Sequence, residues 1–268
     1  MRVLYVCTAN ICRSASAAQL LREAVDADVS LAGVEVRSAG TLAIPGLPGC
    51  AVAPALVGVC EEHRSQPLTR ELTEWADLLL PAALDHRSAI ATLNPAVRSR
   101  TFTIRQAGRI AHWLVESGMV RAAWERAERV GDERWADSFE RGDPRIDVEP
   151  MPADSAARID WLVGELDAAR GMTAVVPVAG AGRESARWRL GRDRATDGDQ
   201  RQRRLGSAAS VGPKAGGPAG RIPRVDPSAI HPDDIPDPHV LGAGLHALAY
   251  EQLRASNDAL VGLLRAVR

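Results

Sequence analysis

Residues 2–26 read RVLYVCTANICRSASAAQLLREAVD, and this stretch decides the fold. Its first residues are a short apolar, β-branched run, which is typical of a fully buried strand. The segment from residue 14 to 26 is rich in good helix formers and carries an apolar stripe at Leu20 and Leu21. The strand ends at Cys7, and Arg13 stands directly before the helix. The pattern predicts the first strand–loop–helix unit of an α/β fold.

Strands and helices continue to alternate beyond this unit. Further strands are expected at 34–40, 76–81 and 100–104. Helices are expected at 51–61, 68–75, 82–93, 107–118 and 245–267. Alternation of this kind predicts an α/β protein with a four-stranded, mostly parallel sheet flanked by helices.

Composition narrows the cell compartment and the partners. The 268 residues carry a formal net charge of −1, which gives no sign of a nucleic-acid partner. No apolar run is long enough for a membrane span, and the first residues lack the features of a signal peptide. Four cysteines are too few for a disulfide scaffold in a chain of this length. We therefore expect a cytoplasmic protein with free thiols and no membrane partner.

Three regions differ in character. Residues 1–118 and 231–268 carry the α/β pattern and are expected to form one domain. Residues 119–170 have helical spacing and read as an insertion, either a cap over the site or, as we favour, an extension of the packing. Residues 171–230 are rich in Gly, Arg and Pro without apolar periodicity, which predicts disorder.

The third region is also basic. Between positions 180 and 225, eleven Arg and Lys residues stand against four Asp and Glu, a local charge of about +7. A solvated linker is the simpler interpretation. The alternative is an electrostatic tether to an acidic or phosphorylated partner.

The loop after the first strand has the composition of an anion site. Its backbone N–H groups can form a nest at the carboxyl edge of the sheet, and the helix N-terminus adds positive potential. Both features, together with the Arg13 guanidinium, favour the thiolate of Cys7, which is the nucleophilic form. Arg13 offers a planar fork for two phosphoryl oxygens, and Ser14 can hydrogen-bond the sulfur. The arrangement predicts a thiolate placed to attack phosphorus.

Two questions stay open from the residues alone. Transfer from an aryl phosphate also needs a proton donor for the leaving oxygen. Asp237, held between two prolines, is the candidate, and Asp233 and Asp234 are nearby competitors. Cys12, within the same loop, is either a packing residue or a redox partner of Cys7.

These motifs resemble a known family. CTANICRS after an N-terminal strand is similar to the signature Cys-x-Gly-Asn-x-Cys-Arg-Ser-Pro of low-molecular-weight protein-tyrosine phosphatases. The family's Ser-Ala-Gly turn is matched at residues 38–40, and residues 63–68 resemble the stretch before its third strand. An Asp-Pro pair before a C-terminal helix is matched by Asp237 and the segment 245–267. The resemblance covers about residues 1–118 and 231–268.

The resemblance implies a role for each matched residue. Cys7 would be the nucleophile that forms a phosphocysteine intermediate, Arg13 would bind the phosphoryl oxygens, and Asp237 would be the general acid and then the general base. The remaining matched residues would bind phosphate or support the loop: Thr8, Ala9, Asn10, Ile11, Cys12, Ser14, Ser38 and His63. No metal or organic cofactor is implied, and the partner would be a phosphorylated protein.

Departures from the signature keep alternatives open. Ala9 replaces a glycine, Ala15 replaces a proline, and His239 stands where tyrosine-specific members usually carry an aromatic residue. Ile11 resembles the tyrosine-directed branch, because related arginine phosphatases carry threonine there. A phosphotyrosine phosphatase is the expected function. A thiol-dependent arsenate reductase and a catalytically weak phosphate-binding protein are the alternatives.

Overall fold

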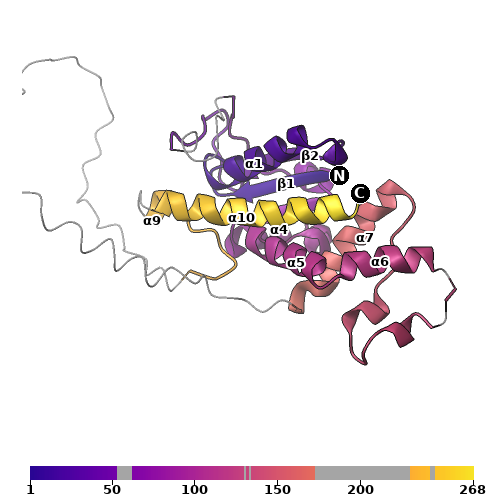
Figure 1. The fold of residues 1–268 in the computed structure, drawn as a ribbon. Coiled ribbons are helices and arrows are strands. Elements are labelled where there is room, and N and C mark those ends of the chain that lie inside the picture. The colour runs from indigo at the N-terminus through magenta and orange to yellow at the C-terminus, as the bar shows by residue number, and fades with distance from the viewer. Residues whose placement is uncertain (53–61, 130, 133, 173–229, 242–244) are drawn as a thin grey trace, which may run out of the picture. The chain divides into compact units, whose positions relative to one another are not determined.

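The computed structural model describes residues 1–52, 62–129, 131–132, 134–172, 230–241 and 245–268 (Figure 1). Its sheet has three parallel strands in the order β2-β1-β3. β1 spans Arg2–Cys7, β2 spans Glu35–Gly40 and β3 spans Leu78–Pro81. β1 is the central strand, so its carboxyl end is flanked by both neighbours. The predicted α/β class with a parallel sheet is confirmed.

Side chains of β1 alternate between two apolar layers. Val3 and Tyr5 belong to the larger layer, whereas Leu4 and Val6 belong to the smaller one. All four side chains are fully buried. A strand covered on both faces needs apolar residues at every position, which explains the continuous run at the start of the chain.

Three helices cover the larger face: α1 (Arg13–Ala27), α5 (Ile104–Glu116) and α10 (Leu245–Ala266). Figure 1 shows α10 lying along α5 in the same layer. The contact is close at Gly108, where an added Cβ would lie 2.8 Å from the Ser256 backbone. Tyr5 donates a hydrogen bond to Asn257, which ties α10 to the central strand.

Two shorter helices cover the smaller face. α3 spans Arg70–Trp75 and α4 spans Leu84–Leu93. Leu72 and Ile90 pack with the inner residues of β1 and β3 on this side. The protein is therefore a three-layer structure with the sheet in the middle.

The expected fourth strand is reduced to a single bridge in the described part of the chain. Thr101 pairs with Leu79 in parallel, and the Phe102 amide donates to the Leu79 carbonyl at 3.0 Å. A 3₁₀ helix occupies Pro95–Arg100 before this point, and Thr103 caps α5 directly after it. The strand predicted over 100–104 is therefore shorter than expected, because the preceding residues form the 3₁₀ helix and Thr103 caps α5.

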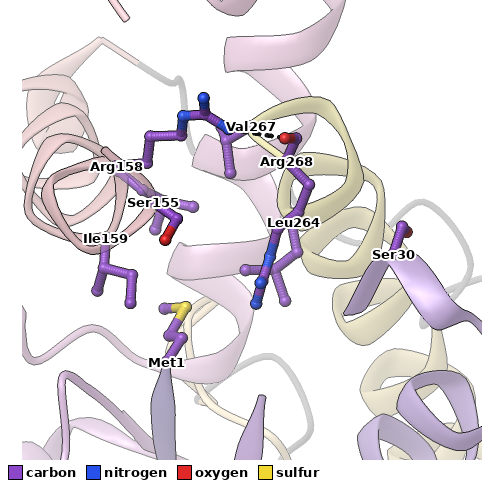
Figure 2. Close-up of a pocket in the computed structure, with 9 residues that line it drawn as sticks. Met1, Ser30, Ser155, Arg158, Ile159, Leu264, Val267 and Arg268 are labelled. Atoms are coloured by element: carbon purple, nitrogen blue, oxygen red, sulfur yellow. Dashed lines mark hydrogen bonds between the residues drawn. The ribbon is translucent and has the colours of Figure 1, made fainter. Parts of the chain in front are cut away.

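Residues 119–172 add helices to this core. α6 spans Met119–Glu128 and α7 spans Ser155–Ala168, and both contact α5. α9 (Pro238–Leu241) leads into α10. A cavity of about 340 Å³ lies between α7 and the end of α10, with Met1 and Ile159 in its lining (Figure 2). Met1 precedes the amino end of β1, so this cavity lies at the opposite edge of the sheet from Cys7.

Several expectations concern residues outside the described ones. The helix expected at 51–61 falls largely there, as does nearly all of the segment 171–230 with its basic charge. Among the helices that the structure describes, none is long and apolar enough to cross a membrane.

Candidate active site

Cys7 lies at the carboxyl end of β1 and is nearly fully buried. We call residues 7–13 the cradle loop, because they connect β1 to α1. The Sγ atom of Cys7 lies 3.0 Å from Ser14 Oγ in the first turn of α1. The strand end and the helix start therefore place a hydroxyl group directly against the sulfur.

Asn10 organises the cradle loop from within. It has φ 54°, the one left-handed backbone angle at a non-glycine residue in the described part of the chain. Its Nδ2 donates to Ser14 Oγ at 3.0 Å and to Ser38 Oγ at 2.9 Å. His63 Nε2 donates to the Asn10 carbonyl at 2.6 Å, and the Gln66 amide donates to Asn10 Oδ1 at 2.9 Å. Asparagine tolerates this backbone conformation better than most residues.

The segment after β2 packs against the cradle loop with little space between them. A Cβ added to Gly40 would lie 2.6 Å from the Thr8 carbonyl and 2.8 Å from the Asn10 amide, so only glycine fits there. Ala9 does not have a left-handed backbone. An alanine in place of the family's glycine therefore causes no left-handed backbone strain at this position.

Arg13 and Asp237 meet at the mouth of the cradle loop. The Arg13 guanidinium is buried and forms an ion pair with the Asp237 carboxylate. The guanidinium also donates to Thr8 Oγ1 at 3.2 Å and to the Ile235 carbonyl at 3.2 Å. Asp237 Oδ1 accepts the His239 amide at 3.0 Å, which caps the start of α9. Positions 13 and 237 are thus brought together across most of the chain.

The two competing carboxylates are engaged elsewhere. Asp233 pairs with Arg109 on α5. Asp234 accepts the Leu84 amide at 2.8 Å at the start of α4, and burial raises its pKa. Of the three acidic residues in this segment, Asp237 is the one whose ion pair is with the cradle loop.

Cys12 contacts the C-terminal helix. Its Sγ lies 3.3 Å from the Tyr250 hydroxyl on α10. Burial raises the pKa of Cys12 to about 12, so the group is a protonated thiol at neutral pH. Cys7, Cys12 and Cys50 form no disulfide.

The chain is similar to known phosphatases. The family model described as low molecular weight phosphotyrosine protein phosphatase matches residues 2–116. A protein-arginine-phosphatase of Geobacillus stearothermophilus is 37% identical over 108 residues, which are 39% of this chain and 70% of that protein. This chain belongs to the low molecular weight phosphotyrosine protein phosphatase family.

Other members of the family show similar identity. The low molecular weight protein-tyrosine-phosphatase Etp of Escherichia coli is 35% identical over 108 residues, 39% of this chain and 69% of that protein. A crystal structure of a YwlE mutant from Bacillus subtilis matches at 33% identity and a TM-score of 0.37, over 40% of this chain and 72% of that one. The members of the family are cysteine-dependent phosphatases, so this phosphatase is a hydrolase acting through a cysteine. Neither an arsenate reductase nor a phosphate-binding protein is favoured by these similarities.

The structure places further residues against the cradle loop that were not predicted from the sequence. Gln66 holds Asn10 through its backbone and donates from Nε2 to the Ser38 carbonyl at 2.8 Å. The Nε2 atom of His86, a residue of α4, lies 2.9 Å from Thr8 Oγ1. A usable signal existed for His86, because it follows β3 at the same carboxyl edge where β1 ends in Cys7.

His86 gives a pH-dependent prediction. Burial, and then the positive charge of Arg13, lower the pKa of His86 from its ordinary 6.5 to about 4. Between these values the unfolded chain binds a proton that the folded protein does not, so stability falls as the pH falls from about 6.5 to 4. Because of His86, the free energy of unfolding of the wild type should be roughly 2 to 3 kcal/mol lower at pH 4.5 than at pH 7.

The variant His86→Gln keeps a polar group beside Thr8 but does not titrate. We expect its free energy of unfolding, measured with urea, to lose roughly 2 to 3 kcal/mol less than the wild type between pH 7 and 4.5. His112→Gln, at an exposed position of α5, is the matched control and should follow the wild type. Parallel pH curves for His86→Gln and the wild type would contradict the assignment.

Proposed function

We propose that this protein hydrolyses phosphotyrosine in proteins, with Cys7 as nucleophile, Arg13 as the phosphoryl-binding group and Asp237 as the proton donor. One observation carries the proposal. A buried thiol lies 3.0 Å from Ser14 Oγ at one end of the cradle loop, and Arg13 at the other end forms an ion pair with a carboxylate from position 237. Nucleophile, anion-binding group and acid therefore share one site.

The reaction divides into two transfers. In the first, the Cys7 thiolate attacks phosphorus, an S–P bond forms, the P–O bond to the phenol breaks, and protonated Asp237 gives its proton to the leaving oxygen. In the second, Asp237 takes a proton from water, the water oxygen attacks phosphorus, and the S–P bond breaks to release phosphate and the thiolate. Ser14, hydrogen-bonded to the sulfur, stabilises that thiolate as it leaves.

Arg13 is well placed for the charge that both steps develop. Its guanidinium is a rigid fork that matches two equatorial phosphoryl oxygens. The group is held by Thr8 and by the Ile235 carbonyl, so it needs little reorganisation when the phosphoryl group binds. The same side chain orients Asp237 at the edge of the site.

An apolar surface beside the cradle loop favours an aromatic substrate side chain. Two hydrogen bonds hold the loop after β2 against the cradle loop. The Leu42 amide donates to the Thr8 carbonyl, and the Cys50 amide donates to the Ile11 carbonyl, both at 2.9 Å. Leu42 is 77% exposed and Ile44 is 66% exposed. Large apolar side chains left exposed beside a site suit a phenyl ring better than a charged guanidinium. Ile11 in the cradle loop supports the same preference.

We also infer that residues 1–118 and 231–268 form the phosphatase domain and that 119–170 extend its packing. α10 packs on α1 and α5, so the C-terminal segment completes the core begun by the N-terminal one. α7 lies at the amino edge of the sheet, beside Met1, and Cys7 lies at the other edge. An extension at that edge does not cover the site.

A panel of phosphorylated peptides tests the substrate. We expect turnover of phosphotyrosine peptides, without added thiol, to exceed that of phosphoserine and phosphoarginine peptides of the same sequence. Ile11→Thr is the informative variant, and it should narrow the ratio between phosphotyrosine and phosphoarginine turnover. Faster turnover of the phosphoarginine peptide by the wild type would overturn the proposed substrate. Arsenate reduction with added thiol, in the absence of peptide turnover, would overturn the hydrolase itself.

A further inference from the structure

Four potential metal ligands meet beside the cradle loop, outside the proposed reacting groups. They are Cys12 and Cys50 with His239 and His246, and their ligand atoms all lie within 4.8 Å of one another. Three of the four side chains are buried, and His239 is exposed. Two thiols and two imidazoles gathered at one point are a set of donors typical of a tetrahedral zinc site.

The separations are close to those that a tetrahedral ion requires. With Zn–S near 2.3 Å and Zn–N near 2.1 Å, neighbouring ligand atoms lie about 3.4 to 3.8 Å apart. Cys50 Sγ and His246 Nε2 are already 3.6 Å apart. The rings of His239 and His246 meet edge to face with their centres 5.0 Å apart. Small rotations of side chains would bring the whole set to the ion.

We propose that Cys12, Cys50, His239 and His246 bind one Zn²⁺ ion as a closed Cys₂His₂ site. On binding, the two thiols release their protons to solvent and the imidazoles bind in their neutral form. The two thiolates balance the two positive charges of the ion. The resulting site carries no net charge, which lowers the cost of burying the ion.

Neighbouring groups already support such ligands. The Tyr250 hydroxyl lies 3.3 Å from Cys12 Sγ and accepts a hydrogen bond from Ser16 Oγ at 3.1 Å. Tyr250 can therefore donate its proton to the Cys12 sulfur. Its ring also stacks on the His246 ring, with 19° between the planes, which fixes the orientation of that imidazole. Outer groups of this kind orient metal ligands and strengthen binding.

The ion would join the two ends of the phosphatase domain. Cys12 directly precedes Arg13, and His239 comes two residues after Asp237. A metal bound to both would hold the segment that carries Asp237 against the cradle loop. This consequence rests on the proposed function, whereas metal binding itself does not involve Cys7 or Asp237.

Cobalt substitution tests the site on the full chain. Tetrahedral Co²⁺ with thiolate ligands has visible ligand-field bands and a near-ultraviolet charge-transfer band that grows with the number of thiolates, whereas Zn²⁺ is spectroscopically silent. We expect one Co²⁺ per chain with the intensity of two thiolates, displaced by one equivalent of Zn²⁺. Zn²⁺ should also raise the melting temperature, and a chelator should reverse that rise.

Single substitutions locate the ion. Cys50→Ser should reduce the charge-transfer band to that of one thiolate. His239→Ala, at an exposed position that should not disturb folding, should weaken Zn²⁺ binding at least about tenfold. Cys7→Ser and the control His112→Ala should leave the cobalt spectrum unchanged. Binding of less than one metal ion per chain would overturn the proposal. So would loss of the cobalt spectrum in Cys7→Ser. A Cys12–Cys50 disulfide in the protein purified without reductant would also overturn it. Loss of peptide turnover in Cys7→Ser with the spectrum intact separates this result from a failure of the proposed function.

Discussion

Replacing Cys7 by serine is expected to reduce the turnover of a phosphotyrosine peptide by at least about 10⁴-fold. Serine is close in size to cysteine and can keep the contact with Ser14, so the cradle loop should hold its shape. Its hydroxyl is not ionised at neutral pH, and no general base contacts that position among the groups described, so the first transfer fails.

Binding should separate from chemistry in this variant. Arg13 and the backbone amides of the cradle loop are unchanged in Cys7→Ser, so inorganic phosphate and vanadate should still bind, measured by calorimetry or by protection against heat. Arg13→Lys is the contrasting variant, because a lysine cannot provide the bidentate fork. It should lose both turnover and phosphate binding. Appreciable turnover by Cys7→Ser would exclude Cys7 as the nucleophile.

The second large effect is expected at Asp237. Asp237→Asn keeps an oxygen to cap α9 at His239 but cannot donate a proton at the working pH. Hydrolysis of phosphotyrosine, whose phenolate is a poor leaving group, should slow about 10²- to 10⁴-fold, the usual contribution of a general acid. p-Nitrophenolate is a better leaving group that needs less protonation as it departs. The first transfer from p-nitrophenyl phosphate should therefore slow far less.

The ion pair with Arg13 adds a second readout for this variant. Removal of the Asp237 charge leaves the guanidinium without its competing anion, so inorganic phosphate should bind more tightly to Asp237→Asn than to the wild type. Asp234→Asn is the matched control, because Asp234 caps α4 and does not contact Arg13 in the described structure. Asp234→Asn should keep the wild-type ratio between the turnover rates of phosphotyrosine and p-nitrophenyl phosphate. Equal slowing of both esters by Asp237→Asn would remove Asp237 from the acid role.

The fold was predictable where local pattern and burial agree. The apolar run before Cys7 specifies a strand that needs cover on both faces, and the following helix formers specify α1. The 100–104 segment shows the limit of this reasoning. Its alternation suited a strand, but Thr103 is a better helix cap, and α5 gained the residues that the strand would have used.

The candidate site divides in the same way. Cys7, Arg13 and Ser14 are close neighbours along the chain, so their proximity follows from the short segment that joins them, and a chemical role for them could be proposed from spacing alone. Asp237 was the predicted acid, with Asp233 and Asp234 as competitors, and only the structure could show that Arg109 and the start of α4 engage those two carboxylates.

By itself, the sequence determined the strand and the loop that follows it, and it named the residues proposed to react there, because those residues are neighbours along the chain. Tertiary structure alone decided which distant side chains complete the site. His86 lies on α4, Cys50 lies in the segment after β2 and His246 lies on α10, and only the tertiary fold brings these three parts of the chain beside the cradle loop. Contacts between residues so far apart leave no local periodicity, which is the physical reason that spacing did not reveal them.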